Sequence, residues 1–466
     1  MIDVSGKHIH LIGIGGAGLS AIARVLLQQG AQVSGSDLLL SPVAQALARD
    51  GARVLVGHQA ENVAGADLVV LSSAVPGSNV EVLAARAAGI PVLKRPELLG
   101  RMMDGSTGVA IAGTHGKTTT TAMIASILLE AGCDPTFIVG GVLANLGTNA
   151  RAGKGPHFVV EADEYDHTFL SLRPRVAVVT NVEHDHPDCY PTFADFRAAF
   201  EQFTALVLRE GLLAVCWDDP VARELGQRRQ AQGGAVAYFG LGVGAAWKAE
   251  DVRPNLAGGV GFLAAHEEQL LGLVLLRVPG VHNASNAMAA LAVADFLGVP
   301  FGVASRALTE FRGVGRRFEL KGEAGGVTVV DDYAHHPTEI RATLQAARVR
   351  FPDRSLWAVW QPHTYSRTRA LLSDFAQAFK AADRVIVLPI YAARETDSLG
   401  VSSTDVVTAM RHSDVRCARS LDEAVVWLGT EVQPGDVVLT LGAGDGYRVG
   451  EWLLEVLANQ RVANSE

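Results

Sequence analysis

Short apolar runs that end in glycine or polar residues recur along the chain, and this pattern predicts buried β-strands. The first run opens the segment 8–18, leads into a cluster of glycines, and is followed by a helical pattern over 19–27. Strand patterns at 32–35 and 67–71 come next, with helical residues between them. Strands that alternate with helices indicate a doubly wound parallel sheet, whose ligand lies at the carboxyl ends of its strands.

The same pattern starts again twice, near residue 105 and near residue 313. Strand patterns lie at 109–112, 158–160 and 176–179 in the second segment, and at 327–330, 356–360, 384–388 and 437–441 in the third. A chain of 466 residues is too long for one ordinary core. We therefore predict an α/β protein of three domains, at 1–104, 105–313 and 314–466.

The amino-acid composition limits the classes of protein to which this chain can belong. Hydrophobic residues make up 48% and charged residues 19%, as expected for a globular protein. The 40 basic and 49 acidic side chains give a formal charge of −9, which argues against a nucleic-acid partner but does not exclude a nucleotide. Four scattered cysteines without a C-x-x-C motif favour a reducing compartment over a disulfide framework or a zinc site. With neither a signal peptide nor a membrane-spanning run, we expect a cytoplasmic protein.

The segment 113–121 predicts a phosphate-binding loop, because a short strand, a glycine turn, a lysine and a run of threonines follow one another. Backbone N–H groups at a helix N-terminus attract an anion, and Lys117 adds a compact positive charge. Thr118 is placed to offer its hydroxyl to a magnesium ion. Ile111 stands where the usual template has its first glycine, so the loop is a variant. The alternative is a helix capped by Gly-Lys-Thr without a ligand.

The first glycine turn, 13–18, fits G-x-G-x-x-G, and Asp37 lies about 20 residues further on. On these facts alone an NAD-binding fold is a fair interpretation. The motif indicates that a diphosphate can approach the backbone, and it does not identify the rest of the nucleotide.

Two polar clusters follow strands of the second segment. The run 161–166 holds four acids, whose mutual repulsion a cation would relieve, and in a strand Glu161 and Asp163 share a face. The run 180–188 combines histidines with acids. Zinc prefers nitrogen and sulfur ligands, whereas oxygen-rich sites beside a phosphate loop favour magnesium. The alternatives without a bound metal are a solvated acidic loop at 161–166 and a pair of surface histidines at 180–188.

Further candidates lie toward the C-terminus. Asn283 and Asn286 are three apart at a predicted helix start, where their amides could meet an adenine edge or simply cap the helix. Clusters of His, Asp and Arg follow two strands, at 331–337 and 361–369, and suggest recognition of a carboxylate or phosphate. Cations at 316–317 could move over a γ-phosphate when domains close.

Together these motifs closely resemble those of the Mur ligase family, in order and over nearly the whole chain. They read GIGGAGLS at 13–20, GTHGKTTTT at 113–121, EADEYD at 161–166, TNVEHDHPD at 180–188, HNASN at 282–286, GVGRRFE at 313–319, DDYAHHPTE at 331–339 and QPHTYSRTR at 361–369. The resemblance implies a Rossmann-like domain for a UDP-sugar at 1–104, a P-loop-like ATP-binding domain at 105–313, and a Rossmann-like domain at 314–466 that contributes to ATP and amino-acid binding.

The resemblance also implies an activity, that of an ATP- and Mg²⁺-dependent ligase of bacterial peptidoglycan synthesis in the cytoplasm. ATP phosphorylates the carboxylate of UDP-N-acetylmuramate, and the amine of L-alanine attacks the acyl phosphate. Neither a nucleic acid nor membrane insertion is implied, and the oligomeric state, monomer or homodimer, stays open.

The functional residues of the family carry over to this sequence in four groups. The resemblance implies catalytic roles for Lys117, His186, His335, His363 and Arg367. It implies that the nucleotide contacts Gly113, Thr114, His115, Gly116, Lys117, Thr118, Thr119, His282, Asn283, Asn286, Arg317 and Asp332. It implies substrate contacts for Gly15, Gly16, Ala17, Gly18, Ser36, Asp37, Ser72, Ser73 and Arg367. It implies that Mg²⁺ is held by Thr118, Glu161 and His186.

Three positions depart from the family pattern, at Val281, Thr364 and Tyr447. Many relatives carry a charged residue at the first, and some carry arginine at the second. Other Mur ligases use a carbamylated lysine shortly after the histidine that corresponds to His186, and no lysine occurs here before Lys248, which agrees with the alanine-adding branch. We guess that Glu201 supplies that carboxylate directly.

Three other functions stay open from the sequence. The first is a recycling ligase that attaches a preformed peptide to the same sugar nucleotide. The second is an NAD-dependent dehydrogenase, suggested by the first glycine turn and Asp37. The third is a regulatory nucleotide-binding protein without activity, which the departures from the family pattern favour and the intact phosphate loop opposes.

Overall fold

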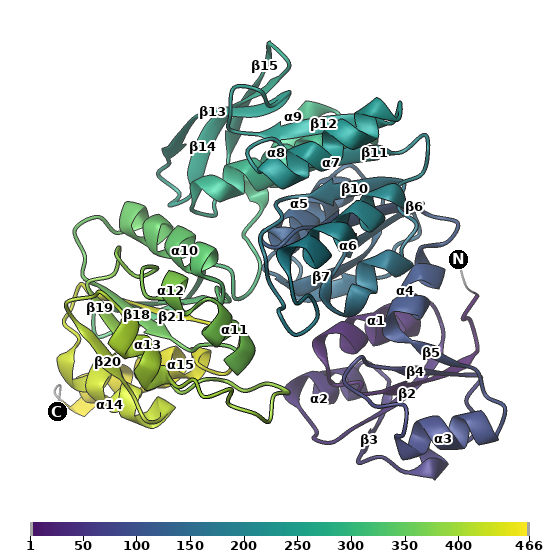
Figure 1. The fold of residues 1–466 in the computed structure, drawn as a ribbon, viewed down its shortest axis with the longest axis horizontal. Coiled ribbons are helices and arrows are strands. Elements are labelled where there is room, and N and C mark those ends of the chain that lie inside the picture. The colour runs from purple at the N-terminus through teal and green to yellow at the C-terminus, as the bar shows by residue number, and fades with distance from the viewer. Residues whose placement is uncertain (1–2, 464–466) are drawn as a thin grey trace.

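Three β-sheets, each with its own helices, follow one another along the chain in the computed structural model (Figure 1), which describes residues 3–463. The first sheet, in purple and blue, contains β1 (His8–Ile12), β2 (Gln32–Asp37), β3 (Arg53–Val56), β4 (Leu68–Leu71) and β5 (Val92–Lys94). Its helices are α1 (Ala17–Gln28), α2 (Pro42–Arg49), η1 (Ala60–Val63), α3 (Val80–Ala87) and α4 (Arg95–Met103).

The strands of the first sheet are all parallel in the order β3-β2-β1-β4-β5, as the alternating pattern predicts. The chain reverses its direction of winding at β1, which has β2 on one side and β4 on the other. Such a switch point opens a crevice at the carboxyl ends of the strands, and the glycine turn 13–18 follows β1 there.

The central sheet has ten strands in the order β15-β14-β13-β12-β11-β10-β6-β9-β7-β8. They are β6 (Thr107–Ala112), β7 (Thr136–Leu143), β8 (Thr148–Arg151), β9 (His157–Glu161), β10 (Val176–Val179), β11 (Leu212–Cys216), β12 (Ala235–Gly240), β13 (Trp247–Pro254), β14 (Val260–His266) and β15 (Gln269–Leu275). The helices are α5 (Lys117–Glu130), η2 (Tyr165–Ser171), α6 (Phe193–Ala205), α7 (Pro220–Ala231), α8 (Val281–Phe296) and α9 (Phe301–Glu310). The antiparallel strands β13–β15 extend one edge of this sheet, away from the phosphate loop.

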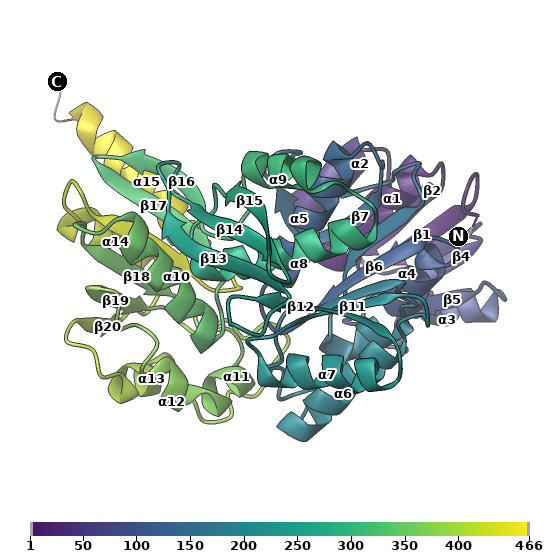
Figure 2. The same cartoon turned by 90° about the horizontal axis from the view of Figure 1, so that it is seen from above.

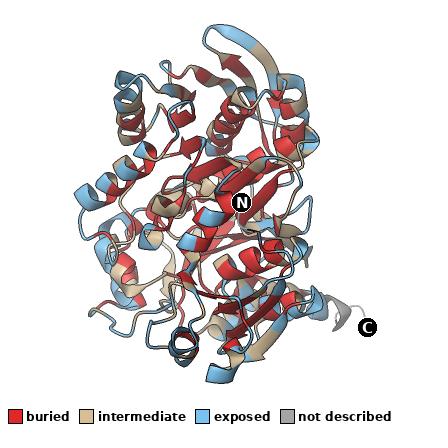
Figure 3. Cartoon of the chain, turned by 90° about the vertical axis from the view of Figure 1, so that its right-hand side faces the viewer, coloured by how far each residue is buried: buried red, intermediate tan, exposed pale blue. Residues whose placement is uncertain are grey.

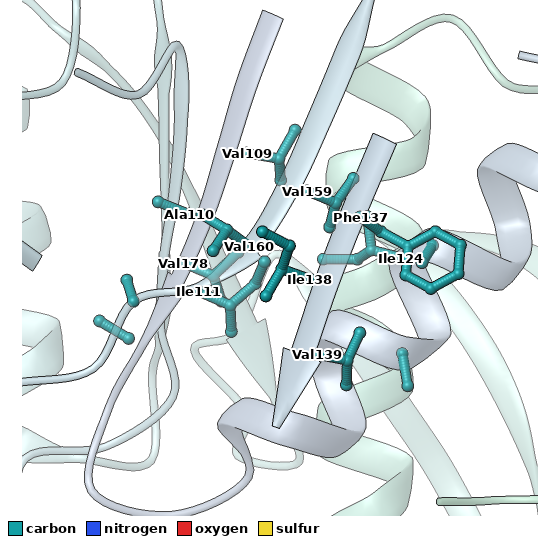
Figure 4. Packing of buried hydrophobic residues seen from close by; sticks show 14 of the residues in the cluster. Val109, Ala110, Ile111, Ile124, Phe137, Ile138, Val139, Val159, Val160 and Val178 are labelled. Carbon is teal, nitrogen blue, oxygen red and sulfur yellow. The ribbon is translucent and has the colours of Figure 1, made fainter. Parts of the chain in front are cut away.

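A core of buried hydrophobic side chains supports the phosphate loop. Figure 4 shows side chains of β6, β7, β9 and β10 packed against one another and against α5, among them Val109, Ala110, Ile111, Ile124, Phe137, Val159, Val160 and Val178. Ile111 is fully buried within β6. It therefore belongs to the strand, which explains why the loop begins only at Gly113.

The third sheet has the order β16-β17-β21-β18-β19-β20, with only β16 antiparallel to its neighbour. Its strands are β16 (Glu319–Ala324), β17 (Val327–Asp332), β18 (Leu356–Trp360), β19 (Arg384–Val387), β20 (Val415–Cys417) and β21 (Val437–Leu441). The helices are α10 (Pro337–Arg350), α11 (Tyr365–Ala370), α12 (Leu372–Phe375), α13 (Ser403–Ala409), α14 (Leu421–Glu431) and α15 (Tyr447–Ala463). Helices lie on both faces of this sheet (Figure 2), and an apolar cluster packs under each layer of helices. Buried residues concentrate in the strands of the molecule (Figure 3), and in this sheet β17, β18 and β21 are buried throughout.

Two connections join the domains, and the predicted domain limits fall within them. The first runs from the end of α4 to the start of β6, and the second from α9 to β16. In the second, Gly315 N–H donates to Val142 O at 2.8 Å, so the chain leaves the central domain only after Gly315. The first domain docks on β8, where Ala152 N–H donates to Gln28 Oε1 at 2.7 Å. Within residues 3–463, no helix has the length and apolar character needed to cross a membrane.

Candidate active site

The turn between β6 and α5 has the backbone of a phosphate loop. Gly113 and Gly116 both have positive φ, 132° and 82°. A Cβ on Gly113 would lie 2.0 Å from Thr180 Oγ1, and one on Gly116 would lie 2.7 Å from Asn286 Oδ1. Both positions therefore require glycine for conformation and for space. The result is a short loop that leads directly into the N-terminus of α5, where backbone N–H groups attract anions.

Lys117 is anchored at the start of α5. Its Nζ donates to Glu164 Oε1 at 2.9 Å and to Thr114 O at 3.1 Å, and also to Gly113 O. Burial alone would lower the pKa of Lys117, but Glu164 and neighbouring carboxylates raise it. The lysine is therefore a fixed cation. Sequence reasoning did not single out Glu164, although it lies within the acidic run 161–166.

Oxygen atoms gather beside Thr118. Its hydroxyl donates to both carboxylate oxygens of Glu161, at 2.9 and 3.0 Å. Burial raises the pKa of Glu161. The Glu164 carboxylate lies between Lys117 and His186, and His186 Nε2 is 3.6 Å from Glu164 Oε1. Glu164 Oε2 is buried and has no hydrogen-bond partner within residues 3–463. A cation close to these groups would offset the buried negative charge.

Within the described residues, one cluster of side chains with metal-binding atoms differs from the predicted ligands. His115, Glu183 and His336 offer ligand atoms that all lie within 4.8 Å of one another. Glu161 and His186 do not belong to this group. The predicted set of Thr118, Glu161 and His186 therefore stays a prediction.

A first cavity, here called the asparagine cavity, lies between the phosphate loop, α8 and α10. Of the predicted nucleotide contacts it holds His115, Gly116, Thr118, Thr119, His282, Asn283, Asn286, Arg317 and Asp332. Asn286 Nδ2 donates to Asn283 Oδ1 at 3.1 Å, which fixes both buried amides. Burial lowers the pKa of His282 to about 4 and raises that of Asp332 to about 6.

A second cavity, here called the acidic cavity, lies between the central and C-terminal domains. Of the predicted residues it holds Thr114, Gly116, Lys117, Glu161, His186, Arg317, His335, His363 and Arg367. It shares Gly116, Arg317 and Glu339 with the asparagine cavity, so the two adjoin at the phosphate loop. Gly113 lines neither cavity, and its carbonyl instead accepts from Lys117.

Two histidines of the acidic cavity are neutral. Burial lowers the pKa of His335 to about 4. Burial, together with the positive charge of Arg367, lowers the pKa of His363 to about 3. His335 Nδ1 donates to Tyr333 O at 2.9 Å, so its Nε2 is an acceptor. A neutral imidazole with a free lone pair can accept a hydrogen bond from an amine.

Arg367 lines the acidic cavity, but its guanidinium is already occupied. Its Nε donates to Asp185 Oδ1 at 2.7 Å and its Nη2 to Asp185 Oδ2 at 3.2 Å, and both residues are buried. A third nitrogen, Nη1, donates to His363 Nδ1 at 3.0 Å. Arg367 thus ties α11 to the loop after β10, and Asp185 is a partner that the sequence did not identify.

His115 forms a second tie between the same domains. Its Nε2 lies 2.8 Å from Glu183 Oε2 and its Nδ1 lies 3.4 Å from Glu339 Oε1. Burial alone would lower the pKa of His115, but the two carboxylates raise it to about 9. The Thr338 hydroxyl also donates to Glu183, at 2.8 Å.

We expect the stabilising effect of His115 to depend on pH with a defined sign. Its pKa is raised on folding, so the contribution is fully present below about 6.5, the ordinary value, and fades as the pH rises through about 9. The difference in thermal midpoint between the wild type and His115→Gln, followed across this range, measures the effect and should shrink toward alkaline pH. A difference that stays constant would contradict the assignment. The control is His266→Gln, since His266 stacks on Trp247 and has no carboxylate within ion-pair distance in the described structure.

The predicted sugar-nucleotide residues lie apart from both cavities, at the carboxyl edge of the first sheet. They are Gly15, Gly16, Ala17, Gly18, Ser36, Asp37, Ser72 and Ser73. Gly15 N–H donates to Asp37 Oδ2 at 2.9 Å. Ser36 is fully buried and its hydroxyl donates to Glu81 at 2.5 Å, so its contact with the substrate stays a prediction. Arg95 lies against Gly18 and reaches Asp163 of the acidic cavity at 3.6 Å.

The guess about Glu201 is wrong. Glu201 lies on α6 and pairs with Arg197 at 3.1 Å and Arg228 at 2.7 Å, and it lines neither cavity. The carboxylates that lie beside His186 are those of Glu164, at 3.6 Å, and Asp185, at 3.7 Å.

The three residues that depart from the family pattern each have different neighbours in the structure. Thr364 caps α11, because its hydroxyl accepts from Arg367 N–H. The Tyr447 ring lies under the Arg316 guanidinium, 4.6 Å from its centroid. Arg316 also donates to Asp331 at 2.8 Å, so of the two arginines at 316–317 only Arg317 faces the cavities. Val281 is half exposed at the start of α8.

Comparison with known proteins agrees with this architecture. Three family descriptions match in order: "Mur ligase family, catalytic domain" over residues 8–107, "Mur ligase middle domain" over 111–294, and "Mur ligase, glutamate ligase domain" over 316–444. A UDP-N-acetylmuramate–L-alanine ligase of Roseiflexus sp. (strain RS-1) is 47% identical, across 97% of this chain and 100% of the relative. One from Caldanaerobacter subterraneus subsp. tengcongensis is 45% identical, across 96% of this chain and 97% of the relative.

Solved structures show the same fold. UDP-N-acetylmuramate-alanine ligase MurC from Thermotoga maritima has a TM-score of 0.81 at 29% identity, covering 98% of this chain and 100% of that one. A murein peptide ligase from Psychrobacter arcticus has a TM-score of 0.73 at 27% identity, covering 97% and 99%.

The fold and the two adjoining cavities define a three-domain α/β protein with a phosphate loop at a domain interface. The chain belongs to the Mur ligase family, and it is accordingly an enzyme of the ligase class. This membership overturns the dehydrogenase interpretation of the first glycine turn.

Proposed function

We propose that this chain joins L-alanine to the carboxylate of UDP-N-acetylmuramate and converts ATP to ADP and phosphate. The observation that carries the proposal is the junction of the two cavities at the phosphate loop, where Lys117 and the neutral His335 and His363 line the same acidic cavity. The names of the relatives that are about 45% identical support the choice of both substrates.

In the first step, a carboxylate oxygen of the sugar nucleotide attacks the γ-phosphorus of ATP. The bond to the β–γ bridging oxygen breaks, ADP leaves and an acyl phosphate forms. We assign ATP to the asparagine cavity, with its phosphates at Gly116 and Lys117. A fixed, partly buried cation stabilises the charge that spreads over the phosphoryl oxygens, and it needs no reorganisation during the reaction.

In the second step, the amine nitrogen of L-alanine attacks the acyl carbon, and the C–O bond to phosphate breaks. The proton that the amine loses leaves with the departing phosphate, so the products are the amide and hydrogen phosphate. His335 Nε2 is a neutral acceptor in the acidic cavity and can hold the amine by a hydrogen bond without repelling it. In the proposal, residues 1–104 hold the sugar nucleotide, 105–313 hold ATP, and 314–466 hold the amino acid and one side of the nucleotide.

The oxygen-rich group beside the phosphate loop fits a magnesium ion. Thr118 and Glu161 offer a hydroxyl and a buried carboxylate. Glu164, whose Oε1 lies near His186, adds a second carboxylate, and its Oε2 has no hydrogen-bond partner among the described residues. We assign Mg²⁺ to Thr118, Glu161 and His186. When bound, the ion would neutralise phosphate charge.

The test follows phosphate and amide product with purified enzyme, ATP, Mg²⁺ and UDP-N-acetylmuramate, with L-alanine, glycine, L-serine, a tripeptide or no acceptor. We expect equal amounts of phosphate and amide, with L-alanine preferred and some turnover of glycine and serine, because one methyl group is worth only about 1–3 kcal/mol. Phosphate release that ignores the sugar nucleotide would exclude this function. A preference for the tripeptide would favour the recycling ligase, and no turnover would favour the regulatory alternative.

A further inference from the structure

Among the described residues, four lysine and arginine side chains line the acidic cavity, and three of them already pair with a carboxylate of the protein. The three pairs are Lys117 with Glu164 (2.9 Å), Arg317 with Glu339 (3.4 Å) and Arg367 with Asp185 (2.7 Å). The fourth cation, Arg394, has no carboxylate within ion-pair distance among the described residues. Its guanidinium instead lies 5.9 Å from the centroid of the Tyr165 ring.

Arg394 is exposed, but the backbone around it is held in place. On one side, Tyr391 N–H donates to Pro362 O at 2.8 Å and Thr364 N–H donates to Tyr391 O at 2.9 Å. On the other side, the Glu395 carboxylate accepts from the N–H groups that open α11 at residues 365 and 366, at 2.5 and 3.0 Å. The loop that carries Arg394 is therefore pinned to α11, beside the histidines of the acidic cavity.

Tyr165 places the guanidinium across the domain interface. The tyrosine belongs to the central domain, its ring lies 5.0 Å from that of His186, and its hydroxyl donates to Asp188 at 3.0 Å. An arginine stacked on an aromatic ring keeps the edge of its guanidinium free for hydrogen bonds. The guanidinium of Arg394 thus has N–H groups at the cavity that can donate to a ligand.

An amino-acid acceptor carries a carboxylate that does not react and that needs a cationic partner. The cavity wall would repel it elsewhere, because Asp163, Glu164 and Asp188 also line this space. Arg367 is less suited to this role, because its Nε and Nη2 already donate to Asp185 and its Nη1 donates to His363, which leaves no pair of donors for a second carboxylate. Arginine forms paired hydrogen bonds with a carboxylate, which fix its orientation as well as its position.

We propose that Arg394 binds the α-carboxylate of the amino-acid substrate and thereby positions the amine for attack. This inference rests on the proposed ligase function. By this proposal, a loop residue outside the family motifs distinguishes an amino-acid acceptor from an amine that has no carboxylate.

The first test is the kinetic constants of Arg394→Gln. We expect the KM for L-alanine to rise about 10- to 100-fold, the range for charge-assisted hydrogen bonds, while the KM values for ATP and UDP-N-acetylmuramate stay close to wild type. Arg394→Lys should fall between the two, because it keeps the charge and loses the fork. The matched control is Arg369→Gln, an exposed arginine on α11 that lines neither cavity and forms no ion pair in the described structure.

The second test removes the carboxylate from the acceptor instead of the arginine from the enzyme. The wild type should use L-alaninamide far less well than L-alanine, and Arg394→Gln should lose most of that discrimination, which a merely structural role would not produce. Equal discrimination in both enzymes would overturn the proposal, and so would a rise in the KM for UDP-N-acetylmuramate in place of that for L-alanine. A wild type that forms no amide would instead refute the proposed function itself.

Discussion

Replacing Lys117 with alanine is expected to lower kcat by about 10³-fold or more while the three domains remain folded. The ammonium is held by Glu164, Thr114 and the Gly113 carbonyl at the start of α5, so its position does not depend on a bound ligand. Negative charge redistributes over the phosphate oxygens as the phosphoryl group transfers, and a cation that is already in place stabilises this developing charge. The measurement is single-turnover formation of ADP with saturating substrates.

This variant also leaves Glu164 buried without its cation, which alone could reduce the yield of folded enzyme. The double variant Lys117→Ala with Glu164→Gln separates the two effects. We expect the added substitution to recover part of the thermal midpoint and none of the activity. If Lys117→Ala turned over at a rate near that of the wild type, the phosphate loop would not be the site of phosphoryl transfer.

The sheets could be predicted because their signal is local. A buried parallel strand reads as an apolar run that ends in polar residues, and β6, β10 and β18 all show this pattern in a few consecutive positions. The loop after β6 could be predicted for the same reason, since Gly113 and Gly116 impose their backbone within one turn. The family resemblance then supplied the order of the domains.

The partners inside the site could not be predicted in the same way. Asp185 and Arg367 are 182 positions apart, and Thr338 and Glu183 are 155 apart, so no spacing in the sequence indicates that they meet. Ser36 lies at the predicted strand end, but whether its hydroxyl faces the ligand or the core depends on Glu81, from α3. Arg394 lies in a loop whose sequence shows no periodic pattern. It can be recognised only in the structure, because the other three cations of the cavity each pair with a carboxylate and Arg394 does not, within the described residues.

Breaking the ion pair between Asp185 and Arg367 is expected to have the largest effect on stability. Both side chains are buried, and they join the loop after β10 to α11 of the C-terminal domain. Removing one partner leaves the other charge buried and unpaired, which costs about 3–5 kcal/mol. Arg367→Met should therefore lower the stability of the docked domains by about this amount, measured from urea-induced unfolding followed by tryptophan fluorescence.

The double variant Asp185→Leu with Arg367→Met distinguishes an unpaired charge from lost packing. With neither charge present, the desolvation penalty disappears, and we expect the double variant to be more stable than Arg367→Met alone. The exposed pair Arg253–Asp251, at 2.6 Å, is the matched control, because Arg253→Met should cost less than about 1 kcal/mol. If Arg367→Met matched that control, the buried pair would not hold the two domains together. Arg367 also donates to the His363 ring, at 3.0 Å. The rate at which the double variant uses L-alanine therefore shows whether the docking of the two domains is enough to keep His363 in place.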